Sequence, residues 1–154
     1  MNSFRIRGLP AMHFSDLFGL SDEALQQRHA RRMTAENSGY PCRISLTDAA
    51  PGDEVILVNY EHHRADSPYR SSFAVFVREG ETRFDAVNEV PEQLRKRMLA
   101  LRGYDTSGML RKAELVDGPN LETGIDAMFA GPDVAYIHAH FAKPGCYAAL
   151  IERH

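Results

Sequence analysis

Two histidines, His138 and His140, are separated by one residue in a stretch that is typical of a β-strand, and Cys146 follows six residues later. Successive side chains of a strand point to opposite faces, so both imidazoles project on one side, about 6–7 Å apart. Two such imidazoles can ligate zinc or iron or act as an acid–base pair, and a nearby thiol can serve as ligand or nucleophile. We therefore expect His138, His140 and Cys146 at any catalytic or divalent-metal site.

A structural interpretation of the same residues stays open. In this interpretation one histidine is buried and hydrogen-bonded while the other is half exposed. A zinc site needs three or four ligands, and His138 and His140 supply only two. The chain offers Cys42, His62 and His63 to complete such a set. As a catalytic thiol, Cys42 needs a positively charged neighbour, whereas the next residue on an alternating strand points to the opposite face. Cys42 is thus either a nucleophile or ligand, or a small buried side chain.

Residues 60–70 form a polar stretch between two apolar ones, and loops of that length in compact domains are often functional. An arginine in this loop can hold an anion through paired hydrogen bonds, and a tyrosine can add a hydroxyl. A second arginine and tyrosine flank Gly103. The alternative is a turn whose polar groups bond to their own backbone. The residues that we expect to bind a small anionic substrate are His62, Tyr69, Arg70, Arg102 and Tyr104.

Length and composition fit one globular domain over residues 1–154, with 44% apolar residues, 25% charged residues and a net charge of −3. Nonspecific nucleic-acid binding needs a basic surface, so no nucleic-acid partner is expected, and the basic run 95–97 is interpreted as a solvated face. No apolar run reaches the roughly 18 residues of a membrane span, and no signal-peptide pattern is visible, so we expect a cytoplasmic protein without a membrane partner. The two common phosphate-binding glycine-loop patterns are missing, so no nucleotide cofactor is expected.

The two cysteines are far apart in the sequence. In a reducing compartment Cys42 and Cys146 are expected as thiols. The alternative is a disulfide that closes a loop of about 100 residues and stabilises the fold by up to about 4–5 kcal/mol in the chain-entropy model.

The hydrophobic patterns predict an α+β domain with a largely antiparallel sheet and a few helices packed on one face. Residues 121–129 carry an apolar helical stripe, and two short connections predict antiparallel hairpins. The expected helices are 15–27 with Ser21 as its N-cap, a short one that begins at Pro91 and carries Leu94 and Met98, and 121–129 after the cap Asn120. The expected strands are a half-exposed edge strand 4–7, an alternating strand 42–46, two buried central strands 55–58 and 73–77, and the hairpins 99–104 with 110–116 and 134–140 with 146–151.

Six segments follow one another along the chain: Tyr40–Leu46, Pro51–Val58, His62 with Ser67-Pro68-Tyr69, Leu101–Asp105, His138–His140 and Pro144–Tyr147. This ordered set resembles the DUF1203 family, a bacterial family of unknown function whose members have about this length. The resemblance therefore covers nearly the whole chain and implies no activity or cofactor. One departure is that Ser72-Phe73-Ala74 stands where the family is expected to have a glycine–proline pair before Val75, which would alter the shape of a site lined by that turn.

These observations lead to the expectation of a small-molecule-binding protein, with enzymatic activity left open. Its site should lie between the loop His62–Arg70 and the hairpin His138–Cys146, with Cys42 and Arg102 near the wall. Two alternatives belong to other classes of protein: a metal-binding module without catalysis, and a structural or interaction protein that forms a homodimer, for example through the edge strand 4–7.

Overall fold

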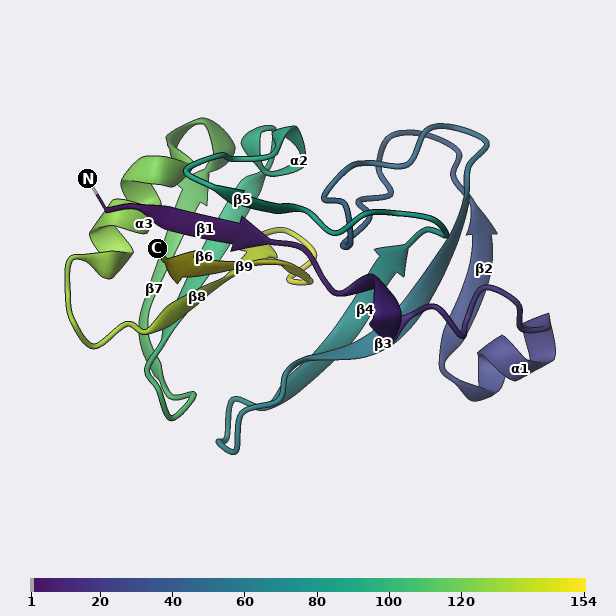
Figure 1. Cartoon of the computed structure of the whole chain (residues 1–154), viewed down its shortest axis with the longest axis horizontal. Coiled ribbons are helices and arrows are strands. Elements are labelled where there is room, and N and C mark those ends of the chain that lie inside the picture. Colours follow the sequence, from purple (N-terminus) through teal and green to yellow (C-terminus); the bar gives the residue numbers. More distant parts are fainter. Residues whose placement is uncertain (1) are drawn as a thin grey trace.

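Two antiparallel sheets form the framework of the computed structural model, which describes residues 2–154 (Figure 1). The larger sheet has six strands in the order β5-β1-β9-β8-β6-β7. Both expected hairpins are present in it as β6–β7 and β8–β9. The strands are β1 Phe4–Arg7, β5 Asp85–Val87, β6 Met98–Tyr104, β7 Leu110–Asp117, β8 Tyr136–Phe141 and β9 Tyr147–Arg153.

The smaller sheet consists of β2 (Ala30–Thr34), β3 (Glu54–His63) and β4 (Ser71–Val77), with β3 in the centre. The central position of β3 agrees with the prediction. β4 is an edge strand instead of a central one, and one side of its first half is open to solvent, as the 41% exposure of Phe73 shows. β3 also continues past its apolar run to His63, so the expected long polar loop shrinks to residues 64–70.

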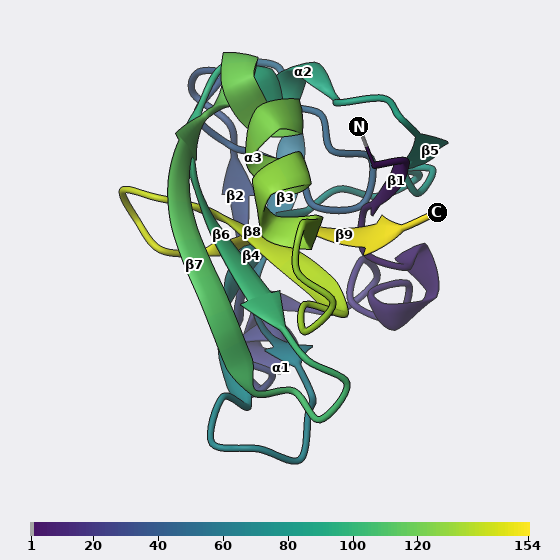
Figure 2. The same cartoon turned by 90° about the vertical axis from the view of Figure 1, so that its left-hand side faces the viewer.

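Three short helices complete the α+β fold: α1 (Asp22–Gln27), α2 (Glu92–Arg95) and α3 (Leu121–Phe129). The Ser21 hydroxyl accepts a hydrogen bond from the Ala24 amide, so the predicted N-cap is confirmed, although the helix is shorter than expected. α2 stops before Met98, which opens β6. α3 lies across one face of the larger sheet and buries its predicted apolar stripe (Figure 2). Two 3-10 turns, Ala11–His13 and Gly118–Asn120, flank these helices.

Two sequence predictions were wrong because pairing with residues distant in the sequence decides the structure at both places. β1 is not an edge strand, because residues 85–87 pair with its second side while β9 pairs with the first. The stretch 42–46 is not a strand but a turn held by two isolated bridges, Pro41 to Asp48 and Cys42 to Phe76. The alternating apolar residues of this turn are buried as expected, but Arg43 between them is buried as well.

The apolar interior has three parts. One lies between α3 and the larger sheet, one lies under the smaller sheet and the N-terminal turns, and a small one surrounds Cys42. Within residues 2–154 the structure contains no helix with the length and apolar character of a membrane span.

Candidate functional site

Side chains from both sheets meet in a packed group of rings, called here the imidazole cluster. The alternation along β8 turns His138 and His140 toward the smaller sheet, with 6.4 Å between their ring centroids, while Ile137 and Ala139 face the core under α3. The strand geometry inferred from the sequence is therefore confirmed for this pair. The cluster consists of His62, His63, Tyr104, Tyr136, His138, His140 and Tyr147.

The extension of β3 brings two further histidines into contact with β8. The register between β3 and β4 shifts between Tyr60 and His63, and the rings of both His62 and His63 reach His138, at centroid distances of 6.1 and 5.0 Å. His62 also lies 5.2 Å from His140. A regular strand would send neighbouring side chains to opposite faces, so this convergence depends on the bulge.

Three imidazoles of the cluster are neutral at physiological pH. Burial lowers the pKa of His62 to about 4 and that of His140 to about 3, and it lowers the pKa of His138 well below its ordinary value. The positive charge of Arg102, which pairs across the sheet with His138, acts in the same direction on all three. An uncharged imidazole offers one donor and one acceptor nitrogen.

The hydrogen bonds of the cluster are only partly complete. His63 bonds through Nδ1 to the Tyr69 carbonyl (2.8 Å) and through Nε2 to the Tyr136 hydroxyl (2.7 Å). His140 Nδ1 donates to the Gly145 carbonyl at 3.0 Å. Three buried nitrogens, His62 Nδ1, His138 Nδ1 and His140 Nε2, have no partner among the described residues. Each unpaired buried nitrogen lowers the stability of the fold by about 1–3 kcal/mol. The packing of the rings must therefore offset that loss.

The predicted metal ligands His138, His140 and Cys146 do not surround one point. Because His140 pairs with Tyr147, the Cys146 backbone bonds to Phe141 (2.9 Å) and its thiol lies on the face of the sheet opposite the imidazoles. In the part of the chain that is described, no group of three or more His, Cys, Asp or Glu side chains is placed to hold a metal ion.

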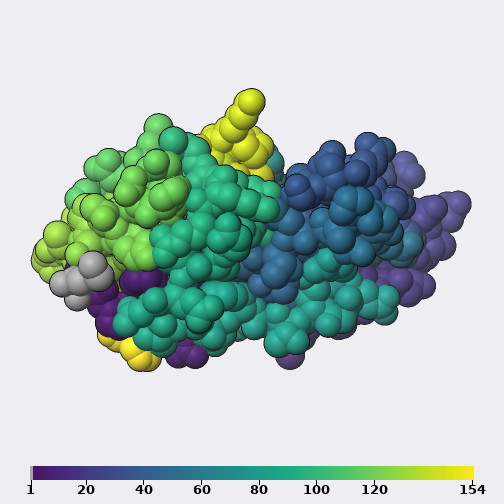
Figure 3. Space-filling view, turned by 90° about the horizontal axis from the view of Figure 1, so that it is seen from above, coloured from purple at the N-terminus to yellow at the C-terminus, as the bar shows by residue number. Residues whose placement is uncertain are grey.

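Cys146 instead lines a cavity of about 640 Å³ at the end of the larger sheet that carries the turn between β8 and β9, where residues of the smaller sheet also reach. Its walls come from β3 and β4 on one side and from the turn between β8 and β9 on the other; Figures 2 and 3 show that this turn stands out from the body of the molecule. We call this space the Arg43 cavity. Its lining residues are Gly39, Pro41, Arg43, Leu57, Phe73, Ala74, Phe76, Lys96, Arg97, Met98, Phe141, Ala142, Lys143, Pro144 and Cys146.

The Arg43 cavity is cationic. Four of its lining residues, Arg43, Lys96, Arg97 and Lys143, carry positive charge, and none of its described lining residues carries a carboxylate. Lys96 and Arg97 share the single carboxylate of Asp48, at 2.7 and 3.1 Å. Within residues 2–154 neither Arg43 nor Lys143 forms an ion pair. The electrostatic balance of the cavity therefore favours an anion.

Arg43 is the most unusual of these cations because only 1% of it is exposed. Its Nε donates to the Tyr147 carbonyl at 2.7 Å, its Nη1 donates to the Pro41 carbonyl, and its Nη2 lies 3.0 Å from the sulfur of Cys146. The guanidinium carbon is 4.9 Å from the centre of the Phe141 ring. Burial lowers the pKa of Arg43, since a buried guanidinium loses its hydration, and no carboxylate compensates that loss.

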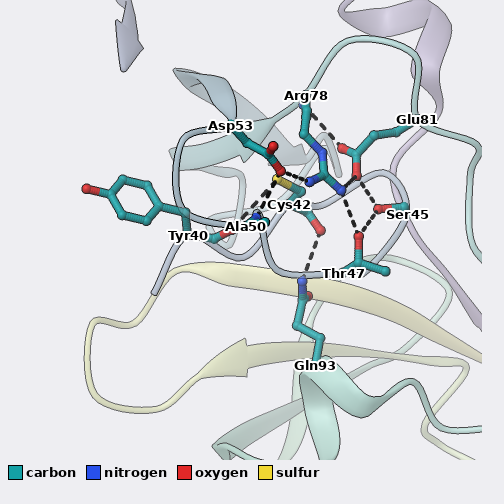
Figure 4. A network of polar contacts seen from close by, with 9 residues as sticks. All are labelled: Tyr40, Cys42, Ser45, Thr47, Ala50, Asp53, Arg78, Glu81 and Gln93. Carbon is teal, nitrogen blue, oxygen red and sulfur yellow. Dashed lines mark hydrogen bonds and ion pairs between the residues drawn. The ribbon is translucent and has the colours of Figure 1, made fainter. Parts of the chain in front are cut away.

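The second cysteine lies apart from both groups. Cys42 packs in the small third core, and its thiol donates weakly to the Tyr40 carbonyl at 3.7 Å. Figure 4 shows it beside the polar network in which Arg78 joins Asp53 and Glu81. Burial raises the pKa of the Cys42 thiol to about 12. Both cysteines are free thiols, in agreement with the expectation for a reducing compartment.

The remaining predicted residues lie either at the imidazole cluster or outside both the cluster and the Arg43 cavity. Arg102 and Tyr104 join the imidazole cluster, and the ring of Tyr69 lies at its margin, 6.1 Å from that of Tyr104. Arg70 is exposed and pairs with Glu61. The structure thus brings His62, Arg102 and Tyr104 to the two histidines of β8, puts Cys146 in the cavity, and leaves Cys42 and Arg70 outside both.

Sequence reasoning missed the cations of the cavity. The basic run 95–97 was expected to be a solvated face, and Lys96 is exposed as expected, but Lys96 and Arg97 also line the cavity. Arg43 was expected on the outer face of a strand. The one signal in the sequence is that Arg43 stands between the apolar residues Cys42 and Ile44, and in the structure both of these are buried together with it.

The structure is a two-sheet α+β domain with a cavity that has apolar walls and four cationic lining residues. The chain belongs to the DUF1203 family, since the family model described as "Protein of unknown function (DUF1203)" matches residues 39–153. Every lining residue of the Arg43 cavity falls within that match. Phe73 and Ala74, where the chain departs from the expected glycine–proline pair, are part of its wall. No curated protein and no solved structure matched the chain.

Proposed function

We propose that this protein binds a small organic anion with an apolar body in the Arg43 cavity. The observation that carries the proposal is the combination of four cationic side chains with walls made mainly of apolar and aromatic groups, and with no carboxylate among the described lining residues. A volume of about 640 Å³ is ordinary for a small-molecule site.

The charged end of the ligand is assigned to the cations. Lys143 is exposed and has no counter-ion within residues 2–154, so it is the cation free to pair with a carboxylate or phosphate that enters the cavity, while the buried Arg43 adds a fixed positive charge nearby. A charge that is desolvated without a partner is costly, and an ion pair in a shielded cavity is stronger than one at the surface.

The apolar body of the ligand is assigned to the aromatic walls. Phe73 is 41% exposed and Met98 is 52% exposed, which are high values for such large side chains. Both lie at the cavity, so a bound apolar group covers surface that water now contacts. Burial of apolar surface contributes about 25 cal/mol per Å², and the two side chains therefore provide a driving force separate from charge.

In this proposal the imidazole cluster supports the site. His140 holds the turn between β8 and β9 through its bond to the Gly145 carbonyl, one residue before Cys146. The Tyr147 carbonyl, one residue after it, accepts from Arg43. We also propose a cytoplasmic location, which the two free thiols support.

The proposal is tested by calorimetry with octanoate and its neutral isostere octanamide. Octanoate should bind at least about tenfold more tightly, equivalent to about 1.4 kcal/mol. Lys143→Gln should weaken octanoate alone, and Phe73→Ser should weaken both ligands. Lys112→Gln is the matched control, since Lys112 is outside the cavity and donates to the Ala127 carbonyl. Equal binding of octanoate and octanamide, or binding of neither, contradicts the proposal.

A further inference from the structure

A thiol next to a buried guanidinium forms one wall of the Arg43 cavity. Cys146 is 8% exposed, and its sulfur lies 3.0 Å from Nη2 of Arg43. Guanidinium groups favour the thiolate form of a neighbouring cysteine, and the thiolate is the nucleophilic form. Arg43 has no carboxylate partner within residues 2–154, and the sulfur of Cys146 is the one side-chain atom among its described hydrogen-bond partners.

We propose that Cys146 is a nucleophile that forms a covalent bond with electrophilic organic anions held in the Arg43 cavity. The inference rests on the proposed function and specifies its ligand class: an anion that carries an electrophilic carbon close to its charged group. Lys143 and Arg97 attract the anionic group, while Arg43 remains bonded to the sulfur. The ligand is thus bound next to the atom that attacks it.

The covalent step needs no further reactant. The thiol proton leaves to solvent, the sulfur of Cys146 attacks the electrophilic carbon, a sulfur–carbon bond forms, and the bond from that carbon to its leaving group breaks with the electron pair on the leaving group. With iodoacetate as the probe, the products are S-carboxymethyl-Cys146, iodide and a proton. The several cations that line the cavity raise the local concentration of such an anion.

The other cysteine provides an internal contrast. Cys42 lies in the third core and not at the cavity, and burial raises the pKa of its thiol to about 12, so its nucleophilic form is scarce. The two thiols of one folded molecule should therefore differ strongly in reactivity. This contrast requires no variant and cannot be confused with a folding defect.

The experiment compares iodoacetate with iodoacetamide on the native protein, with mass-spectrometric mapping of each cysteine and with glutathione as the free-thiol reference. We expect modification of Cys146 alone until the protein is unfolded. We also expect the ratio of the iodoacetate rate to the iodoacetamide rate to be at least about tenfold higher at Cys146 than for glutathione. Lys143→Gln should lower this ratio and Lys112→Gln should not. An equal reaction of Cys42, or a ratio no higher than that of glutathione, overturns the inference.

A competition arm separates this inference from the proposed function. Octanoate should slow the modification of Cys146 by iodoacetate. If calorimetry detects octanoate but Cys146 reacts more slowly than glutathione with both reagents, the inference is wrong and the proposed function stands. If octanoate neither binds nor protects, the proposed function is wrong and the inference falls with it.

Discussion

The rings of His62 and Tyr147 stack almost parallel, with 5.0 Å between their centroids and 19° between their planes. Because His62 belongs to β3 and Tyr147 to β9, this stack joins the smaller sheet to the larger one. The ring of Tyr147 is buried, and the neutral imidazole packs on it without bringing charge into the interior. The junction of the sheets therefore depends on His62 remaining unprotonated.

The protein should lose stability in mild acid. The pKa is about 4 for His62 and about 3 for His140 in the folded state, against the ordinary 6.5, so below pH 6.5 the unfolded chain binds more protons than the folded one. Stability is then fully present above about pH 7 and falls as the pH drops from 6.5 toward 4, by up to about 1.4 kcal/mol per pH unit for each histidine. Urea unfolding at pH 7.5, 6.0 and 5.0, values chosen around the ordinary histidine pKa of about 6.5, measures this slope.

Replacing His62 by phenylalanine should flatten that dependence. His62→Phe keeps an aromatic ring against Tyr147 and removes one titrating group, so the loss of stability per pH unit should shrink by up to about 1.4 kcal/mol. Tyr147→Phe is the control because it alters the same stack without removing a group that titrates in acid: the tyrosine pKa is ordinarily about 10, and burial raises it further. Identical slopes for His62→Phe and the unmodified protein would count against the neutral-histidine junction.

Arg43 should be essential for stability as well as for binding. Arg43→Met fills a similar volume but leaves the carbonyls of Pro41 and Tyr147 without a donor, so we expect a loss of about 2–5 kcal/mol. Chemical unfolding measures the loss, and Arg31→Met, at an exposed arginine, should stay within about 0.5 kcal/mol of the unmodified protein. A near-neutral Arg43→Met would show that the buried guanidinium does not hold the two segments together.

Gly8 should tolerate no side chain. A Cβ built there lies 2.1 Å from the Ile44 carbonyl oxygen and 2.9 Å from that of Arg43, and these are backbone atoms that a rotamer change cannot move. Gly8→Ala should therefore destabilise the protein by about 3 kcal/mol or more and displace the turn that carries Arg43. At Gly19 a Cβ meets nothing within 4 Å, so Gly19→Ala is the matched control, with an expected change between about zero and 1 kcal/mol of stabilisation. Melting temperatures of the pair compare the two positions.

Removing the carboxylate of Asp48 should strengthen anion binding. Asp48 lies within ion-pair distance of Lys96 and Arg97, and Asp48→Asn keeps its shape while freeing both cations of the cavity. We expect octanoate to bind about three- to tenfold more tightly, an effect of about 1 kcal/mol that shrinks in high salt. Calorimetry at two salt concentrations measures both effects, and unchanged or weaker binding would contradict a cationic site.

Features that depend on neighbouring residues could be predicted from the sequence. The hairpins β6–β7 and β8–β9 and the buried stripe of α3 follow from short connections and from hydrophobic periodicity. The position of β1 inside the sheet could not be predicted, because its second partner lies about 80 residues further along the chain and has only three residues. The register shift in β3 that turns both His62 and His63 to β8 has no evident sequence signal.

The site was predicted in part for the same reason. Strand alternation was sufficient to place His138 and His140 on one face. It was not sufficient for Cys146, since the pairing of His140 with Tyr147 decides which face the thiol takes, and a shift of one residue reverses it. The Arg43 cavity exists only because the two sheets bring residues 39–43, β4 and the turn 142–146 together, and no local pattern describes that arrangement.

The pairing of β1 with β9 has a consequence for how this chain acquires its structure. Phe4 lies opposite Arg153, so the main-chain groups of β1 find their partners in β9 only after the chain has been made as far as Arg153. Pairing between strands so far apart in the sequence is slow in small proteins, because the chain loses the conformational entropy of a long loop before it gains any contact. We expect β1 and β5 to dock late, onto a preformed unit of β6–β9 and α3, during both synthesis and refolding.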